Sequence, residues 1–288
     1  MTSIGCHTDL WSPRKGEFSE LPALLGIEGK IVPARKPTEV LGRILPCIAE
    51  VTGLPLDTQV SVGIHDSNAS LYPHILTQNA PFSVVSTGTW VISMSVGGDN
   101  ISLDPLRDTL INVNALGQAV PSARFMGGRE YEIIQQGHQS SPSPRDIADV
   151  LASSLMIFPS VEPRSGPFQG QKTQWSGEEP EFGTGRRAAA LAFYLALMTD
   201  TCLQLTGASG HTIVEGPFAR NAEFISMLMA ATDRPVLTSQ AATGTSIGAA
   251  MLMGASIEPD KPERSVATLN LKALKAYAIQ WRSRTGSA

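Results

Sequence analysis

The chain has 288 residues, of which 42% are hydrophobic and 17% are charged. This length and composition are typical of one large or two ordinary globular domains, and they exclude disordered, collagen-like and coiled-coil proteins. The charge balance is 22 Lys and Arg against 26 Asp and Glu, a net charge of −4. Because no basic block stands out, the sequence argues against nucleic-acid binding through a broad cationic face.

Cysteine usage and hydropathy indicate the compartment. The 3 cysteines, Cys6, Cys47 and Cys202, lack the number and spacing of a disulfide framework or a zinc knuckle, which favours a reducing compartment. The first residues contain no apolar signal-peptide core. The longest apolar run, residues 188–198, is too short to cross a bilayer and predicts a buried helix. We therefore expect a cytoplasmic protein that does not enter a membrane.

The first part of the chain predicts few regular elements. Residues 1–37 are rich in Gly, Pro and charged residues, which predicts loops and short turns without a core of their own. A helix is predicted from Thr38, as its N-cap, to Glu50, although Pro46 should bend or shorten it. Strands, the first of them buried, are then predicted at 59–64, 82–86, 90–96, 109–114 and 118–121. The second and third of these strands, and the fourth and fifth, read as hairpins, and a helix should follow to about Gln136.

The second part of the chain alternates between helices and strands. Residues 137–185 shift towards Gly, Pro and Ser and predict a long surface loop or flap, with a short helix (146–153) and strand (155–158) before its longest part. The elements predicted beyond it are a helix at 185–206 capped by Thr184, a strand at 211–215, a helix at 221–231, a strand at 235–238 and a helix at 245–254. This order of elements predicts an α/β layer fold, a mixed sheet with flanking helices.

Three polar segments follow predicted strands, where open α/β sheets place ligands. In GIHDSNAS (63–70), Asp66 begins a helix, and its negative charge is favourable at the positive helix end. A carboxylate in this place can act as the general base that takes a proton from a substrate hydroxyl. The sequence physics fits an ordinary N-cap aspartate as well. His65 beside it is expected to be structural or to contact a substrate rather than to bind a metal.

The other two segments contain glycine turns. In VVSTGTW (84–90), small hydroxyl residues around a glycine expose successive backbone N–H groups that can hold phosphate oxygens, but an ordinary hairpin tip has the same pattern. In IVEGPFARN (213–221), Gly216 permits close backbone approach to a ligand before a helix N-terminus, or it only turns the chain. The Walker motif GxxxxGK[ST], the Rossmann motif GxGxxG and the metalloprotease motif HExxH are all missing from the sequence.

Five motifs together carry a family resemblance. They are GIHDSNAS, STGTW, ARFMGGREYE, IVEGPFARN and GTSIGAAMLMG, in this order. The chain, from its start to about Gly254, resembles the C-terminal half of the FGGY family of carbohydrate kinases. The HDS and STGTW segments are most similar to the rhamnulokinase and fuculokinase branch. The resemblance implies the actin-like, ribonuclease-H-like fold, in which ATP lies between two domains.

The resemblance also implies site residues by position. Asp66 matches the catalytic aspartate that deprotonates the sugar hydroxyl. Ser67, which follows it, stands where a sugar contact is common, and His65, which precedes it, is a second candidate for contact with the substrate. The residues that match contacts to ATP are Thr87, Gly88, Thr89, Gly128, Gly216 and Asn221. The helices at 185–206 and 245–254 should close the adenine pocket. The implied cofactors are ATP and Mg²⁺, and no metal site made by protein side chains alone is expected.

Two departures from the family pattern qualify this expectation. Pro217 stands where many members carry a second glycine, so one backbone N–H is missing. The N-terminal domain, which would supply a DxGT-type turn for phosphate and Mg²⁺ and most sugar contacts, has no counterpart in the sequence. The resemblance thus divides the chain into a remnant of the interdomain region (1–58), the ATP-binding domain (59–260) and a partly helical tail (261–288).

We therefore expect ATP-dependent phosphorylation of a ketose or deoxyketose hydroxyl, by a chain that is weak or inactive alone. The alternative is a catalytically inactive nucleotide-binding fragment. Another actin-like ATPase with a protein partner is less favoured, because STGTW and HDSNAS are typical of sugar kinases. The expected partners are a small sugar and a second copy or a complementing N-terminal half, since a bare interdomain face predicts self-association.

Overall fold

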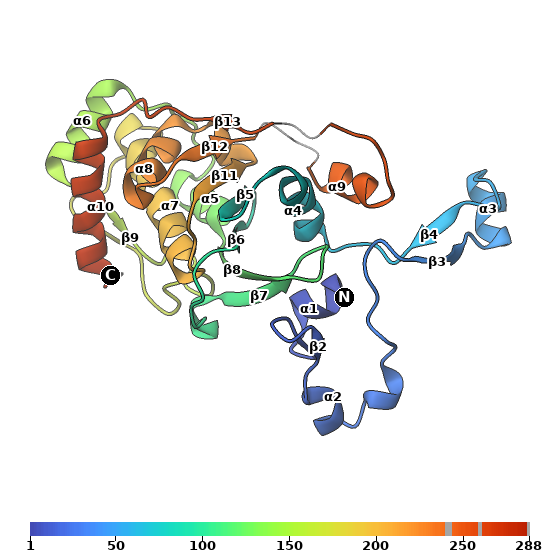
Figure 1. Cartoon of the computed structure of the whole chain (residues 1–288). Coiled ribbons are helices and arrows are strands. Elements are labelled where there is room, and N and C mark those ends of the chain that lie inside the picture. Colours follow the sequence, from blue (N-terminus) through green and yellow to red (C-terminus); the bar gives the residue numbers. More distant parts are fainter. Residues whose placement is uncertain (240–243, 259–260, 287–288) are drawn as a thin grey trace. The chain divides into compact units, whose positions relative to one another are not determined.

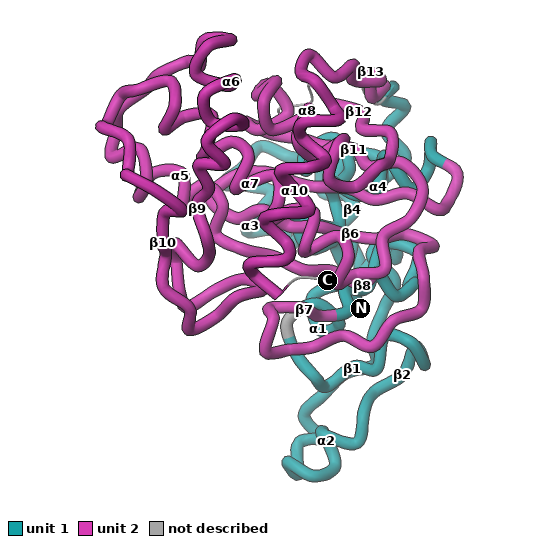
Figure 2. The backbone as a smooth tube through the Cα atoms, turned by 90° about the vertical axis from the view of Figure 1, so that its left-hand side faces the viewer, with its two compact units in different colours: residues 1–78, 111–120, 243–259 teal, residues 79–110, 121–242, 260–288 magenta. Residues whose placement is uncertain are grey.

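The computed structural model of the chain describes residues 1–239, 244–258 and 261–286. The chain forms two compact units (Figure 2). Unit 1 comprises residues 1–78, 111–120 and 243–259, and unit 2 comprises residues 79–110, 121–242 and 260–288. These units do not follow the predicted boundary at residue 58, and the predicted boundary at residue 260 lies outside the described residues.

The main sheet confirms the predicted α/β fold with a mixed sheet. Within the described residues it has seven strands in the order β13-β12-β11-β5-β6-β8-β7 (Figure 1). They are β5 (Phe82–Thr87), β6 (Val91–Val96), β7 (Thr109–Val113), β8 (Ala119–Phe125), β11 (His211–Glu215), β12 (Val236–Thr238) and β13 (Glu263–Arg264). The central strands β5 and β11 run parallel, whereas β6 pairs antiparallel with both β5 and β8. Because β5 and β11 are parallel, the segments that follow them leave the sheet at the same edge.

The helices of unit 2 lie beside the main sheet, most of them to the left of β5 and β6 in Figure 1. They are α5 (Gly127–Gln135), α6 (Pro144–Ser153), α7 (Gly185–Leu205), α8 (Ala222–Thr232) and α10 (Leu271–Thr285), with the short 3-10 helices η2 (Pro105–Arg107) and η3 (Pro217–Arg220). Helix α7 packs against α5, α6, α8 and strand β6, and α8 packs against α10. The predicted cap of α7 is confirmed, since the Thr184 side chain accepts a hydrogen bond from the Arg187 amide.

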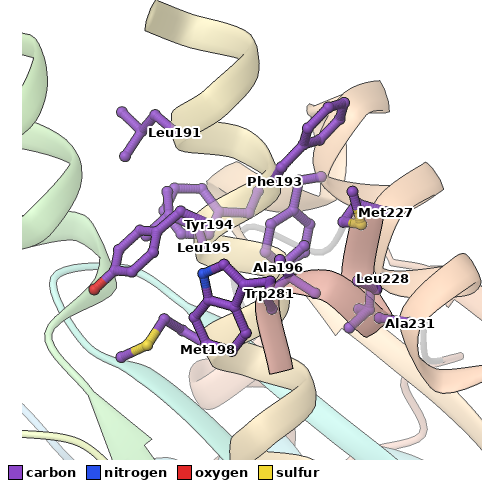
Figure 3. Close-up of a cluster of buried hydrophobic side chains, with 14 of the residues drawn as sticks. Leu191, Phe193, Tyr194, Leu195, Ala196, Met198, Met227, Leu228, Ala231 and Trp281 are labelled. Atoms are coloured by element: carbon purple, nitrogen blue, oxygen red, sulfur yellow. The ribbon is translucent and has the colours of Figure 1, made fainter. Parts of the chain in front are cut away.

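The core of unit 2 is built around α7, as Figure 3 shows. Phe193 and Tyr194 of α7, Leu228 of α8 and Trp281 of α10 are all fully buried in it. Helix α7 is long and apolar enough to cross a membrane, but 89% of its most apolar window is buried inside the structure. We therefore assign α7 to the core, as the sequence predicted.

Two segments of unit 2 are more deeply packed than predicted. The tail contains α10, whose Trp281 Nε1 donates a 2.8 Å hydrogen bond to the Ile157 carbonyl oxygen in the core. The glycine- and proline-rich segment after residue 158 is not a simple surface loop. It buries Phe168 in the same core, and its strand β10 (Gln174–Trp175) pairs with β9 (Ile157–Phe158). Both predictions underestimated burial because polar composition hides a few well-placed aromatic anchors.

Unit 1 contains short elements and two packed helices. Its elements are α1 (Thr2–His7), β1 (Trp11–Ser12), β2 (Glu17–Phe18), α2 (Leu21–Leu24), η1 (Glu28–Lys30), β3 (Val40–Arg43), α3 (Pro46–Thr52), β4 (Gln59–Ser61), α4 (Asp66–Thr77) and α9 (Gly244–Leu252). Helices α4 and α9 pack closely together. A Cβ at Gly248 would lie 1.8 Å from the Ala69 carbonyl oxygen, so only glycine permits this approach.

Several predictions for unit 1 were wrong. The helix predicted from Thr38 to Glu50 is the strand β3 followed by the helix α3. Proline fits the first turn of a helix, and Pro46 therefore begins α3 instead of lying inside it. The strand predicted as buried at 59–64 is β4, which is short and mostly exposed. Residues 1–37 were expected to lack a core, but they form α1 and bury Cys6 and Trp11.

Candidate nucleotide-binding site

Unit 2 contains a cavity of about 550 Å³ where β5, α5 and the segment after β11 meet. This volume falls within the usual range of ligand sites. Its lining is mostly glycines, aromatic rings and amide side chains, with one hydroxyl, one carboxylate and one proline: Gly88, Thr89, Gly128, Tyr131, Glu132, Gln135, Gly137, His138, Gln139, Pro217, Phe218 and Asn221. Four of the residues predicted to contact ATP therefore lie around one cavity, namely Gly88, Thr89, Gly128 and Asn221.

One end of the cavity is formed by the turn that follows β5. The Gly88 amide donates to the Trp90 carbonyl oxygen (2.9 Å), and the Gly128 amide donates to the Thr89 carbonyl oxygen (3.2 Å). A Cβ at Gly128 would lie 2.3 Å from the Gly88 carbonyl oxygen, so residue 128 must be glycine for α5 to begin here. The N-terminus of α5 thus meets the turn, and its positive dipole end favours an anionic group at this place.

The opposite wall is formed by the segment that follows β11. Gly216 has a φ of +83°, and a Cβ on it would lie 2.0 Å from the Thr87 carbonyl oxygen. Both its conformation and its close approach to Thr87 therefore require glycine. Pro217 is the first residue of η3, a position that proline's fixed φ suits and where a helix needs no N–H donor. Asn221 caps α8, since its Oδ1 accepts a 2.8 Å hydrogen bond from the Phe224 amide.

Aromatic and amide side chains complete the cavity away from the glycine turn. The rings of Tyr131 and Phe218 lie 6.3 Å apart between centroids, and Phe218 also contacts Phe224 at 5.3 Å. Gln135 and Gln139 lie in the same lining. Flat aromatic surface with a few hydrogen-bonding groups suits a nucleobase, and the N-terminus of α5 with the exposed Thr89 hydroxyl suits phosphate oxygens. These donors fit a nucleoside phosphate such as ATP.

Thr87 and Gly216 lie behind the cavity rather than in its lining. Thr87 is only 6% exposed, and its hydroxyl donates to the Glu215 carbonyl oxygen and accepts from the Phe218 amide (3.1 Å). Helix 185–206, which was expected to close the adenine pocket, is α7, and none of its residues line this cavity. Its residues Ala188, Ala192 and Leu195 do line a smaller adjoining pocket that shares Tyr131, Gln135, Phe218 and Asn221 with the cavity, so this expectation stays a prediction. Helix α9, the other helix expected there, belongs to unit 1.

The predicted general base Asp66 and the predicted sugar contacts His65 and Ser67 lie in unit 1. Asp66 is the first residue of α4, and the N-cap is His65, so the alternative of an N-cap aspartate was wrong. The Asp66 carboxylate is 76% exposed, and its Oδ1 accepts hydrogen bonds from the Ser67 amide (2.6 Å) and the Ser67 hydroxyl (3.3 Å). His65 Nδ1 lies 3.1 Å from the Ser67 hydroxyl and 3.2 Å from Asp66 Oδ1. The three residues thus form one hydrogen-bonded group at a helix N-terminus.

The sequence analysis missed the cavity residues on α5. Gln135 follows Tyr131 by four residues and Glu132 by three, the spacing of one helix face, after the glycine pair. This spacing could have identified them. The other face of α5 carries Glu130, which is fully buried. Its carboxylate accepts from the Tyr194 hydroxyl (2.9 Å) and the Glu162 amide (3.1 Å), and burial raises its pKa from 4.5 to about 7.

The arrangement of the His, Cys, Asp and Glu side chains decides whether the protein alone can hold a metal ion. Across 1–239, 244–258 and 261–286, no group of three or more His, Cys, Asp and Glu side chains is arranged to hold a metal ion. Glu132 is the one carboxylate in the lining of the nucleotide-sized cavity among these residues. The side chains described therefore do not make a Mg²⁺ site by themselves.

The fold and the cavity define an α/β domain with a ligand-sized cavity, and comparisons with known proteins identify its family. The family model described as "Carbohydrate kinase FGGY, C-terminal domain" matches residues 79–262. The chain is 34% identical to a carbohydrate kinase from Novosphingobium aromaticivorans, with a TM-score of 0.84 over 99% of this chain and 65% of that one. This chain belongs to the FGGY carbohydrate kinase family, whose C-terminal domain it contains, with the actin-like ATPase fold.

More distant solved structures share the fold. A gluconate kinase from Lactobacillus acidophilus is 14% identical, with a TM-score of 0.76 over 99% of this chain and 63% of that one. A ligand-bound xylulose kinase from the same organism is 15% identical, with a TM-score of 0.75 over 99% and 64%. No curated protein matches the sequence. The chain spans less than two thirds of the length of each of these three kinases.

Proposed function

We propose that this chain binds ATP in the unit 2 cavity and takes part in the transfer of its γ-phosphoryl group to a sugar hydroxyl. The single observation that carries the proposal is the cavity itself, in which glycine backbone, a helix N-terminus and an aromatic wall meet. The phosphates would lie at Gly88, Thr89 and Gly128, and the adenosine between Phe218, Asn221 and the face of α5. When bound, Mg²⁺ neutralises phosphate charge in reactions of this class. The reaction is proposed to take place in the cytoplasm.

Asp66 is proposed as the general base. Its carboxylate accepts the proton of the sugar hydroxyl as that oxygen bonds to the γ-phosphorus, while the bond from the γ-phosphorus to the bridging oxygen breaks and ADP leaves. Two observations support this role: the carboxylate is exposed, and its hydrogen bonds to Ser67 fix Oδ1. Ser67 and His65 are proposed to contact the sugar. They also orient the carboxylate through the hydrogen-bonded group that they form with it.

We propose a ketose or deoxyketose as the sugar, as in the rhamnulokinase and fuculokinase branch. The support is the sequence of HDS at 65–67 and STGTW at 86–90. Whether the chain acts alone is a separate matter, because it spans 65% of the Novosphingobium kinase. Phosphoryl transfer requires groups on both sides of the γ-phosphate. We therefore propose that turnover needs a polypeptide equivalent to the part of that kinase that this chain does not cover.

An exposed apolar surface in unit 1 supports a protein partner. The segment 40–60 exposes many large apolar side chains: Val40, Leu41, Leu45, Ile48, Val51, Leu54, Leu56 and Val60. A short segment with so many exposed large apolar side chains is typical of a surface that another chain covers. A complementing N-terminal half is the proposed occupant, and a second copy of this chain is the alternative. The alternative function, a nucleotide-binding fragment without activity, is favoured by the same partial coverage of the relatives.

The experiment compares the purified chain alone with the chain co-purified with the uncovered part of the Novosphingobium kinase. Sugar-dependent release of ADP is measured with rhamnulose, fuculose and xylulose. We expect release from the mixture only, and its loss in Asp66→Asn with nucleotide binding retained. Robust release from the chain alone would refute the need for a second polypeptide. Full turnover by Asp66→Asn would refute the proposed base, and nucleotide binding without turnover in every mixture would establish the inactive alternative.

A further inference from the structure

We propose that Thr87 is a positioning residue that joins the two walls of the nucleotide cavity through its hydroxyl, and that it does not contact the nucleotide; this inference rests on the proposed binding of ATP there. The family resemblance places Thr87, Gly88 and Thr89 together as a phosphate-gripping turn. The structure separates their side chains. Thr89 is exposed in the lining of the cavity, whereas Thr87 is buried behind it.

The position of Thr87 follows from the strand register. The parallel ladder between β5 and β11 ends at the pair Ser86 and Glu215. Beyond this pair the two chains stay in close contact at Thr87 and Gly216, after which one enters the turn at Gly88 and the other enters η3. Thr87 stands where the ladder ends, so its side chain can reach the Glu215 carbonyl oxygen and the Phe218 amide.

The Thr87 hydroxyl uses both of its hydrogen-bonding functions there. Its proton is donated to the Glu215 carbonyl oxygen, and its oxygen accepts the Phe218 amide proton at 3.1 Å. A hydroxyl has one proton to give, so Thr87 has none left for a phosphate oxygen. In the part of the chain that the structure describes, no hydrogen bond is found for the Thr89 hydroxyl, which is therefore the one that a phosphate would meet.

The hydrogen bonds act on the shape of the cavity through Phe218. The Phe218 ring lies in the cavity wall and contacts Tyr131 on the facing helix, and its backbone amide is held by Thr87. Gly216 allows the two backbones to touch, because any Cβ there would overlap the Thr87 carbonyl oxygen and lie 2.8 Å from its hydroxyl. Removing the hydroxyl while keeping the side-chain volume, as in Thr87→Val, leaves the Phe218 amide without its acceptor and frees this wall.

Binding of ATP and of adenosine separates positioning from phosphate contact. Thr87→Val should weaken the binding of both ligands by the same factor, roughly tenfold, which corresponds to the loss of one buried hydrogen-bonded group. Thr87→Ser, which keeps the hydroxyl, should bind both like the wild-type chain. Thr89→Val is the matched control at the exposed hydroxyl and should weaken the binding of ATP while leaving the affinity for adenosine unchanged.

The outcomes distinguish this inference from the proposed function. One outcome is that wild type binds ATP and that Thr87→Val weakens the binding of ATP but not of adenosine. Thr87 then contacts phosphate, so the inference is overturned while the proposed function stands. If wild type binds neither ligand, the proposed function fails and this role fails with it. Hydrogen exchange on the ligand-free wild-type chain provides a second measurement that needs no variant. The Phe218 amide should be protected, and free exchange at this amide would overturn the inference.

Discussion

The buried carboxylate of Glu130 makes a quantitative prediction about stability and pH. Its pKa is raised from 4.5 in the unfolded chain to about 7 in the folded protein, chiefly by burial. Between these two values the folded state keeps a proton that the unfolded state has lost, so stability must fall as the pH rises through this window. At about 1.4 kcal/mol per pKa unit, the carboxylate costs about 3 kcal/mol of unfolding free energy above pH 7.

The perturbation that isolates this cost is Glu130→Gln, which has the shape of the protonated side chain. The linkage relation predicts that the free energy of unfolding of wild type, minus that of Glu130→Gln, falls by about 2.5 kcal/mol between pH 5 and pH 8. The assay is urea unfolding followed by circular dichroism at several pH values. The variant loses one of the two hydrogen bonds from Tyr194 and Glu162, which shifts the difference at every pH but not its slope.

Glu132→Gln on the same helix is the matched control, because this side chain is exposed to solvent before and after unfolding. The control should show no such change of slope relative to wild type. A difference between wild type and Glu130→Gln that stays constant from pH 5 to pH 8 would refute the reasoning. A difference that grows with pH in favour of wild type would refute it as well, because that sign belongs to a carboxylate stabilised in its charged form.

Two further predictions concern the packing behind the cavity and the C-terminal helix. Gly216→Ala should abolish ATP binding and lower the melting temperature, because its Cβ would overlap the Thr87 carbonyl oxygen. Gly170 has a similar positive φ but open space around it, so Gly170→Ala should lower the free energy of unfolding by only about 1 kcal/mol. Equal effects in the two variants would contradict the argument. Trp281→Ala should lower the free energy of unfolding by about 3–5 kcal/mol, because this side chain is buried. Ile279→Ala, on the exposed side of α10, should lower it by less than about 0.5 kcal/mol. A small loss for Trp281→Ala would show that α10 is not packed into the core.

The sequence predicted the parts of the fold in which local signals and burial agree. The sequence predicts Thr184 as the cap of the apolar helix α7 and an apolar strand at His211–Glu215 before a glycine. The structure confirms both. It failed where proline could begin a helix or end one, as at Pro46, and where a few aromatic residues anchor a polar segment, as with Phe168. Those choices depend on contacts between segments far apart in the chain.

The candidate site was predictable in position but not in detail. A glycine turn after a predicted strand indicated Gly216, and the family resemblance indicated Gly128; the structure shows a close backbone approach at both positions. The inward face of Thr87 was not found, because the direction of a hydroxyl depends on which strand lies beside it. The aromatic wall at Phe218 was missed for a similar reason, since its partner Tyr131 lies on a different element.

Photolabelling with 8-azido-ATP tests the central claim, that the cavity of unit 2 holds the nucleotide, most directly. The azide forms a covalent bond with residues next to the base, and mass spectrometry then identifies the labelled peptides. The account predicts label within 131–139 and 217–221, removed by an excess of ATP. Label confined to other parts of the chain, or label that ATP does not remove, would contradict it.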